Sequence, residues 1–270
     1  MRTIQLALLS FALSLVVLSA CGSGEGSERL SESFTYIALG DSLSAGIGAS
    51  DPGATGFVSL VHQSFAEDVE LLNLGHSGDT SQELLDHGHL DEAIAEIEER
   101  NSDEDATNDV ELVTLEIGGN DLLRLYFSLV VTGTCPDLEA AVEKAECVDA
   151  LSSALDEYEP NLASALDRLR EADPSLTIAL LTLYNPFSGF GGPGEIGDLG
   201  LDGLPDTPFP DGLNDIVRRQ AQQRELILVD VFPLFDGRAG ELIAGDLIHP
   251  NDQGHRVMAD AVIAALKGLP

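Results

Sequence analysis

The chain has 270 residues, and its 47 acidic and 13 basic residues give a formal net charge of −34. This composition excludes nucleic acid as a partner, because phosphate binding requires a basic surface. The same charge argues against adsorption to anionic lipids, so we expect membrane attachment through a lipid anchor only. Ordinary solubility and adaptation to high salt are both open explanations of the acidic surface.

Residues 1–20 have the pattern of an export signal. Arg2 precedes an apolar run over 4–18 that is too short to span a membrane and ends in LSAC at Cys21. This ending resembles the lipobox of bacterial lipoproteins, in which the cysteine carries the lipid and begins the mature protein. The resemblance implies a signal peptide, lipidation of Cys21 and an exported, extracytoplasmic protein held at the cell envelope. The alternative is a plain secretory signal with an incidental cysteine.

A tether and a single domain follow the signal. Residues 22–29 are only glycine, serine and charged residues, so we expect a flexible tether over 21–33. The remainder, 34–270, is long enough for one α/β domain with a sizeable core, and it contains no repeat or second linker of this kind. We expect this domain to be a monomer.

Five short apolar runs predict buried strands. Each run is continuously apolar rather than alternating, which is typical of strands covered on both faces. They lie at 34–39, 69–74, 110–117, 176–183 and 226–231.

Helical periodicity lies between these runs. Apolar residues spaced by three and four predict helices at 57–65, 151–169 and 258–266. Pro160 falls inside the second helix and is expected to kink or restart it. Alternating strands and helices predict a parallel sheet, whose functional site lies at the carboxyl ends of the strands.

Glycine and small polar residues follow the first three predicted strands. The segments are GDS at 40–42, NLGHSGDT at 73–80 and GGND at 118–121. After the fourth strand, a Gly/Pro-rich stretch runs through Asp211 and is too long for a simple connection. It is predicted to be either a mobile lid or a disordered surface loop.

One of the six histidines has a carboxylate at a useful spacing. In a turn, Asp246 and His249 would project side by side, as an acid that orients an imidazole requires. Asp246 could instead be a plain turn residue, with Asn251 or Asp252 as the N-cap of the last helix. His76 remains a second candidate base, because it lies near the end of the second strand.

Four sequence blocks together point to a family. GDSLS at 40–44, NxGxSGDT at 73–80, GGND at 118–121 and DxxHPN at 246–251 resemble, in order, the signature blocks of the GDSL (SGNH) hydrolases. The resemblance implies a flavodoxin-like three-layer α/β/α sandwich, here with a five-stranded parallel sheet. It also implies a serine hydrolase of esters or thioesters. We expect no metal and no other cofactor.

The resemblance assigns a role to five residues. Ser42 would be the nucleophile, His249 the base and Asp246 the acid that orients it. The backbone N–H groups of Ser42 and Gly78 and the side-chain amide of Asn120 would form the oxyanion hole. Glycine suits the second position, because no side chain blocks its N–H.

Some of these residues could have local structural roles. Asn120 or Asp121 could be only a helix N-cap. Thr80 and Glu83 have the spacing of a capping box and predict a helix start there. His87 and His89 lie in a polar connecting segment and are expected at the surface. The same is expected of His62, which lies in a helical pattern.

Cys135 and Cys147 form an even pair once Cys21 is assigned to lipid. In an exported chain they are expected to form a disulfide that closes a short loop. Neither cysteine lies in a CxxC pattern or has a histidine at metal-binding spacing, so no zinc site is expected.

The substrate is expected to be a small-molecule or lipid ester. The helical turn that begins at Leu122 follows Asn120 directly and could line an acyl pocket. Because tryptophan is absent, no aromatic platform for carbohydrate is visible, which favours lipid-like or simple carboxylic esters over acetyl groups on polysaccharide. Thioesters and a non-catalytic surface-binding lipoprotein are the remaining alternatives.

Overall fold

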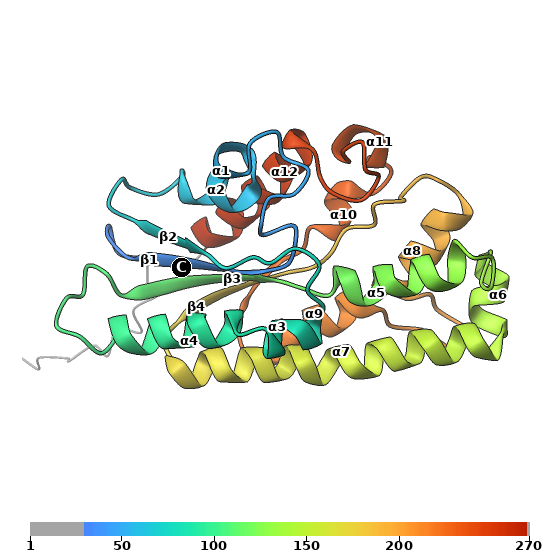
Figure 1. Ribbon diagram of the computed structural model, residues 1–270, viewed down its shortest axis with the longest axis horizontal. Coiled ribbons are helices and arrows are strands. Elements are labelled where there is room, and N and C mark those ends of the chain that lie inside the picture. Colours follow the sequence, from blue (N-terminus) through green and yellow to red (C-terminus); the bar gives the residue numbers. More distant parts are fainter. Residues whose placement is uncertain (1–29, 269–270) are drawn as a thin grey trace, which may run out of the picture.

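The computed structural model describes residues 30–268 (Figure 1). Five strands form one sheet in the order β2-β1-β3-β4-β5, and every neighbouring pair is parallel. Each strand overlaps one of the five predicted apolar runs. The strands are β1 (Thr35–Gly40), β2 (Glu70–Asn73), β3 (Val110–Glu116), β4 (Thr177–Leu181) and β5 (Ile227–Val229).

Helices cover both faces of this sheet, which confirms the α/β sandwich. In Figure 1, α2 and α12 lie on one face, and α4, α7 and α9 lie on the other. The helices are α1 (Pro52–Thr55), α2 (Phe57–His62), α3 (Ser81–Asp86), α4 (His89–Arg100), α5 (Gly119–Leu125), the π-helix η1 (Tyr126–Val130), α6 (Leu138–Glu143), α7 (Ala145–Ala172), α8 (Gly192–Asp202), α9 (Leu213–Gln223), α10 (Phe232–Phe235), α11 (Ala239–Leu242) and α12 (Asp252–Lys267).

The core lies around the three central strands. Every residue of β1 is buried, and β3 and β4 are buried along nearly their whole length. Burying one large apolar side chain contributes roughly 1.5–3 kcal/mol, so these strands form the most firmly packed part of the domain. The loops that leave their carboxyl ends therefore start from fixed positions.

The predicted break at Pro160 does not divide the long helix. Helix α7 is continuous over 28 residues and contains Pro160. The proline lies on the exposed side, whereas Tyr158 and Leu162 are buried on either side of it in the sequence. Burial of these neighbours holds the helix against the sheet and outweighs the hydrogen bond that proline cannot make.

The Gly/Pro-rich stretch after β4 is not a disordered loop, so that alternative is wrong. It contains α8, which starts with a proline in its first turn and packs against α9 and α6. Leu199, Leu201 and Phe209 in this stretch are buried. The many glycines of α8 give it a low intrinsic helix propensity, so the sequence did not predict it. Its stability comes from tertiary packing.

The signal peptide predicted over 1–20 and Cys21, the predicted site of lipidation, lie outside the described residues. Within 30–268, no helix is both long and apolar enough to cross a bilayer.

Candidate active site

A chain of hydrogen bonds joins three side chains at the carboxyl edge of the sheet. Ser42 follows β1, and its Oγ lies 2.9 Å from His249 Nε2. His249 Nδ1 lies 2.6 Å from Asp246 Oδ2. The other carboxylate oxygen of Asp246 accepts the backbone N–H groups of Ile248 and His249, both at 3.0 Å. The structure thus brings together the three residues that the sequence selected.

These contacts keep Asp246 ionised. Partial burial acts to raise the pKa of Asp246, but the hydrogen bond from His249 and those from the two backbone N–H groups lower it overall. A charged carboxylate can hold the imidazole in one orientation and stabilise the imidazolium form.

Neighbouring loops fix the position of His249. A Cβ on Gly48 would lie 2.3 Å from the carbonyl oxygen of Pro250 and 2.8 Å from the Cβ of His249, so only glycine fits where the loop after β1 contacts His249. The buried Tyr184 donates its hydroxyl to the carbonyl of Ile248 at 2.8 Å. Asn251 is the N-cap of α12, as one alternative predicted, and this role is compatible with the Asp246–His249 contact.

Two backbone N–H groups lie free beside this chain of hydrogen bonds. Within residues 30–268, the N–H groups of Ser42 and Gly78 have no hydrogen-bond partner. Gly78 has a φ of +94°, and a Cβ there would meet nothing within 4 Å. Glycine is therefore required at this position by the backbone conformation rather than by lack of space.

The side chain of Asn120 connects two segments of the site. Asn120 Nδ2 donates to the carbonyl of Asp79 at 2.8 Å and to Asp41 Oδ2 at 3.0 Å. The N-cap of α5 is Gly118, and Asp121 instead accepts hydrogen bonds from the start of α3. The alternative in which Asn120 or Asp121 is only a cap is therefore wrong.

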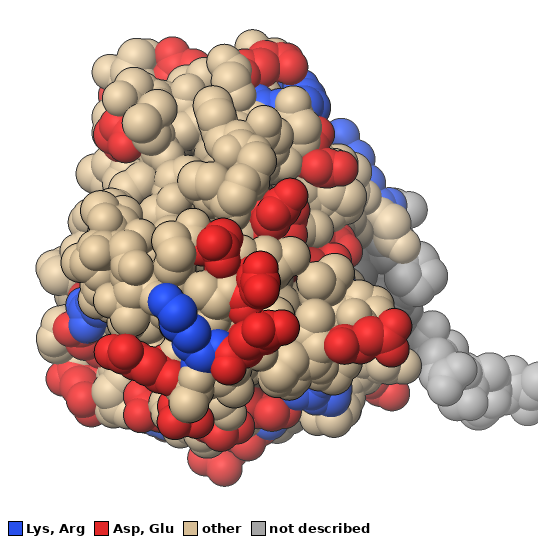
Figure 2. Space-filling model, turned by 90° about the vertical axis from the view of Figure 1, so that its right-hand side faces the viewer, with Lys and Arg blue, Asp and Glu red and all other residues tan. Residues whose placement is uncertain are grey.

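An apolar cavity opens beside Ser42. Its volume is about 1030 Å³ including the mouth, and its lining includes Ser42, Asn120 and His249. Figure 2, which views the carboxyl edge of the sheet, shows acidic side chains across the lower half of this face and a broad uncharged area in the upper half, left of centre. Much of the lining comes from α5, η1, α7 and α8, with Leu122, Leu125, Tyr126, Leu129, Leu151, Leu199 and Leu201 among its residues.

Residues 38–257 match the model of the GDSL-like Lipase/Acylhydrolase family. The chain belongs to this family. It is therefore a GDSL-type hydrolase, an enzyme of the esterase and lipase class that acts on ester bonds.

Individual relatives agree with this assignment. The spore germination lipase LipC of Bacillus licheniformis is 26% identical over 237 residues, which cover 85% of this chain and 95% of LipC. The lipase Lip_vut3 from a goat rumen metagenome has a TM-score of 0.64 at 23% identity, covering 88% of this chain and 98% of that one. A variant of Axe2, an acetyl-xylooligosaccharide esterase from Geobacillus stearmophilus, has a TM-score of 0.55 at 21% identity and covers 86% and 93%. These two structures support the fold.

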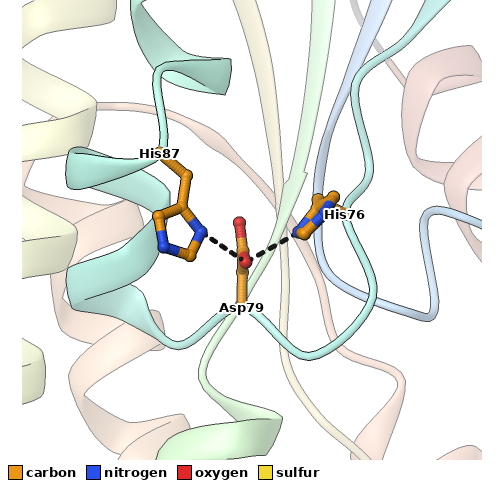
Figure 3. Close-up of side chains that lie close together, drawn as sticks. All are labelled: His76, Asp79 and His87. Carbon is orange, nitrogen blue, oxygen red and sulfur yellow. Dashed lines mark hydrogen bonds and ion pairs between the residues drawn. The ribbon is translucent and has the colours of Figure 1, made fainter.

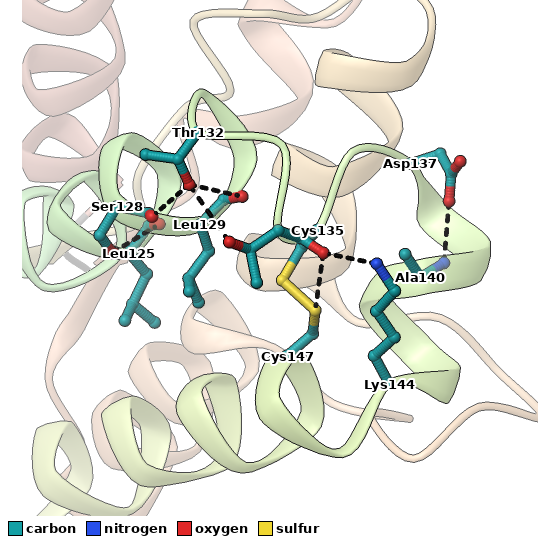
Figure 4. Close-up of a disulfide and its surroundings, with 10 residues drawn as sticks. Leu125, Ser128, Leu129, Thr132, Cys135, Asp137, Ala140, Lys144 and Cys147 are labelled. Carbon is teal, nitrogen blue, oxygen red and sulfur yellow. Dashed lines mark hydrogen bonds between the residues drawn. A yellow bond between two sulfur atoms is a disulfide. The ribbon is translucent and has the colours of Figure 1, made fainter.

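A disulfide lies in the wall of the hydrolase cavity. Cys135 and Cys147 are joined, as the even pair predicted, and both cysteines line the cavity (Figure 4). Lys144 donates to the carbonyl of Thr134 beside this bond. The disulfide ties the loop after η1 to the first turns of α7, so it connects two of the segments that enclose the cavity.

Two buried acids lie behind the hydrolase nucleophile. Asp41 and Glu116 are 2% and 0% exposed, and neither carboxylate oxygen of Glu116 has a hydrogen-bond partner in the described part of the chain. Burial raises the pKa of Asp41 to about 6, against hydrogen bonds that lower it. Burial, followed by the nearby Asp41 charge, raises the pKa of Glu116 well above its usual range. The two buried acids therefore keep their protons to a higher pH than they would in water.

The remaining histidines do not contact Ser42. His76 Nδ1 lies 2.8 Å from Asp79 Oδ1 instead, so the structure does not favour His76 as the base. His87, expected at the surface, also contacts Asp79, while His62 contacts the carbonyl of Val69. Sequence reasoning missed this convergence on Asp79, and the only signal for it was the presence of three histidines and three acids within 76–89.

Proposed function

We propose that this hydrolase cleaves lipid-like or simple carboxylic esters through an acyl-enzyme on Ser42. The observation that carries the proposal is the 2.9 Å contact between Ser42 Oγ and His249 Nε2 at the mouth of the apolar cavity. A nucleophile in contact with its base, beside space for an acyl chain, is the arrangement that ester hydrolysis requires.

The first half of the reaction forms the acyl-enzyme. His249 Nε2 takes the proton of Ser42 as Oγ attacks the ester carbonyl carbon, and the charge of Asp246 stabilises the resulting imidazolium. The tetrahedral intermediate collapses when His249 gives that proton to the departing alcohol. In the second half, His249 takes a proton from water, the resulting hydroxide attacks the acyl carbon, and the proton returns to Ser42 as the carboxylic acid leaves.

The oxyanion hole is formed by the N–H groups of Ser42 and Gly78, which have no other partner among residues 30–268, and by Asn120. Because both hydrogens of the Asn120 amide are already engaged, Asn120 must release its bond to Asp41 to donate to the oxyanion. The bond to the Asp79 carbonyl keeps the amide in position during this exchange. Such donors act mainly in the transition state, where the negative charge develops.

The cavity favours esters with longer acyl chains over acetyl groups on carbohydrate. Its walls are leucine-rich, and each buried methylene of a substrate contributes up to about 0.8 kcal/mol to binding. LipC, which is a lipase by name, agrees with this substrate class. The likeness to Axe2 favours the carbohydrate esterase as the second candidate, since that protein acts on an acetylated oligosaccharide.

A series of acetyl, butyryl, octanoyl and lauroyl esters tests the substrate class. We expect kcat/KM to rise with chain length. The Ser42→Ala variant measures the hydrolysis that does not depend on the nucleophile. The matched variant is Gly200→Leu in α8, because a Cβ at Gly200 would lie 3.5 Å from Leu122 Cδ1 and its side chain would enter the cavity. This variant should reduce the lauroyl-to-acetyl ratio of kcat/KM roughly ten-fold or more. A strict preference for acetyl esters in the wild type would favour the carbohydrate esterase.

The proposal extends to location. Lipidation of Cys21 would hold an exported catalytic domain near a membrane, where confinement raises its effective concentration toward membrane-derived esters. Mass spectrometry of the protein from its native envelope should find a diacylglyceryl group on Cys21, and Cys21→Ser should release the enzyme in soluble form. An unmodified Cys21 in the mature chain would contradict the anchor and leave the esterase assignment intact.

A further inference from the structure

Three histidines converge on one carboxylate beside the loop that carries Gly78. His76 follows β2, Asp79 precedes α3, and His87 is the C-cap of α3 (Figure 3). His76 Nδ1 and His87 Nδ1 lie 2.8 Å and 2.9 Å from the same atom, Asp79 Oδ1. The ring of His89 stacks on that of His76, with the centroids 4.8 Å apart.

The carboxylate of Asp79 is held in place, but only one of its two oxygens accepts hydrogen bonds within the described residues. Its side chain is 3% exposed. Oδ1 accepts both imidazoles, whereas Oδ2 is buried and has no hydrogen-bond partner among the described residues. His89 Nε2 lies 4.0 Å from Oδ2, which is too far for a hydrogen bond. A buried carboxylate oxygen without a partner is costly, so the histidine contacts alone do not account for this arrangement.

We propose that His76, Asp79 and His87 bind one divalent transition-metal ion, with zinc as the best fit. Two imidazole nitrogens and one carboxylate oxygen are the ligands of borderline metals such as zinc, whereas magnesium and calcium prefer oxygen alone. An ion placed among these atoms supplies positive charge to the buried Asp79 carboxylate, which the histidine contacts leave only partly compensated. Water completes the coordination.

The geometry requires only small side-chain movements. The three ligand atoms lie within 4.8 Å of one another. Tetrahedral zinc with bonds of about 2.0 Å separates its ligand atoms by roughly 3.3 Å. Each imidazole nitrogen therefore has to move only slightly away from Asp79 Oδ1, from its present 2.8 Å or 2.9 Å. The side chains of His76 and His87 are 53% and 44% exposed and are free to adjust around the fixed Asp79. The tautomer with hydrogen on Nε2 presents the Nδ1 lone pair of each ring to the metal.

The site would hold the oxyanion loop. His76 and Asp79 flank the turn that contains Gly78, and His87 ends the helix that follows. The carbonyl of Asp79 accepts the Asn120 amide, so the backbone of one metal ligand also positions a second donor of the candidate oxyanion hole. Metal binding would therefore reduce the motion of this loop, whether or not the proposed esterase activity is correct.

Calorimetric titration with zinc chloride tests the proposal without using activity. The protein is the full chain carrying Cys21→Ser, so that a free thiol does not bind zinc, in physiological NaCl with excess Mg²⁺ and Ca²⁺. We expect one zinc per chain and a higher melting temperature with zinc than with EDTA. In His76→Gln/His87→Gln, affinity should fall at least ten-fold, the order of loss seen even for less direct partners of a metal.

Two matched variants separate this site from unspecific binding. His62→Gln removes a histidine outside the cluster, and Asp86→Asn removes an exposed acid next to His87. Both should bind zinc as the parent does. An unchanged melting temperature of the double variant in EDTA shows that it folds. The proposal is overturned if the double variant keeps its zinc affinity, if the two controls lose as much, or if Mg²⁺ and Ca²⁺ displace the zinc.

Discussion

Two histidine–carboxylate clusters at the same edge of the sheet differ in what the carboxylate contacts. Asp246 uses one oxygen for His249 and the other for two backbone N–H groups, so both of its oxygens are satisfied. Asp79 uses one oxygen for two imidazoles and leaves the other without a partner among residues 30–268. The first arrangement is a linear chain that ends at Ser42. In the second arrangement, two imidazoles contact the same carboxylate oxygen.

The two clusters differ in where the nitrogen atoms of their imidazoles point. A proton relay needs one imidazole with an acceptor on one nitrogen and a hydroxyl on the other, as His249 has. A metal site needs several lone pairs aimed at one position, which the second cluster can supply. The Asn120 amide connects the two clusters, because it donates to the carbonyl of Asp79 and to Asp41 beside Ser42.

The largest effect should come from breaking the linear chain. Ser42→Ala and His249→Ala should each lower kcat/KM for a preferred ester by about 10⁵–10⁶-fold, and the double variant should lose little more, because the two groups act as a unit. The melting temperature should stay close to that of the wild type, and Asp86→Asn should keep full activity. If His76→Gln abolished hydrolysis while His249→Ala spared it, the base would lie in the other cluster.

Exchanging each carboxylate for an amide compares the clusters directly. Asp246→Asn should lower kcat by about 10⁴-fold, because the imidazole loses its orienting charge. Asp79→Asn should instead remove the zinc-dependent rise in melting temperature. Kinetics and thermal unfolding of both variants, with and without zinc, distinguish a relay from a metal site. Equal loss of the zinc response in the two variants would refute the distinction.

Asn120→Ala tests the residue that connects the clusters. We expect kcat to fall by roughly 10²–10³-fold with little change in KM, because the lost donor acts mainly in the transition state. Steady-state kinetics and the melting temperature should be measured on the same variant. A large fall in melting temperature with kcat preserved would reduce Asn120 to a structural tie between Asp41 and Asp79.

Glu116→Gln should produce the smallest effect, and one that depends on pH. The raised pKa values of Glu116 and Asp41 mean that the folded wild type binds more protons than the unfolded chain. Their contribution to stability is complete below the unfolded pKa of about 4 and is lost as pH rises through the folded value of about 6 for Asp41.

The glutamine removes one of the two buried charges. The variant should therefore be more stable than the wild type at pH 8, and the advantage should shrink toward pH 4. Denaturant unfolding across this range measures the difference. A constant difference at all pH values would show that the two acids do not titrate in the folded protein.

The sequence by itself determined the sheet and the positions of the site residues. Continuous apolar runs mark strands buried on both faces, and the segments after β1, β2 and β3 meet because parallel strands end at one edge. The spacing of Asp246 and His249 was informative because a three-residue separation within one turn restricts where two side chains lie. The Thr80–Glu83 capping box, which is present in the structure, is also a local pattern.

Only the tertiary structure decided features that depend on packing between distant segments. Helix α8 forms within a Gly/Pro-rich stretch because Leu199 and Leu201 are buried against other helices, and α7 continues through Pro160 for the same reason. The cavity requires walls from several helices and from the segments that follow β1 and β4. The convergence on Asp79 depends on where α3 ends relative to β2. Side chains that meet across such turns leave no periodic pattern in the sequence, since their contact follows from the packed positions of the elements rather than from residue spacing.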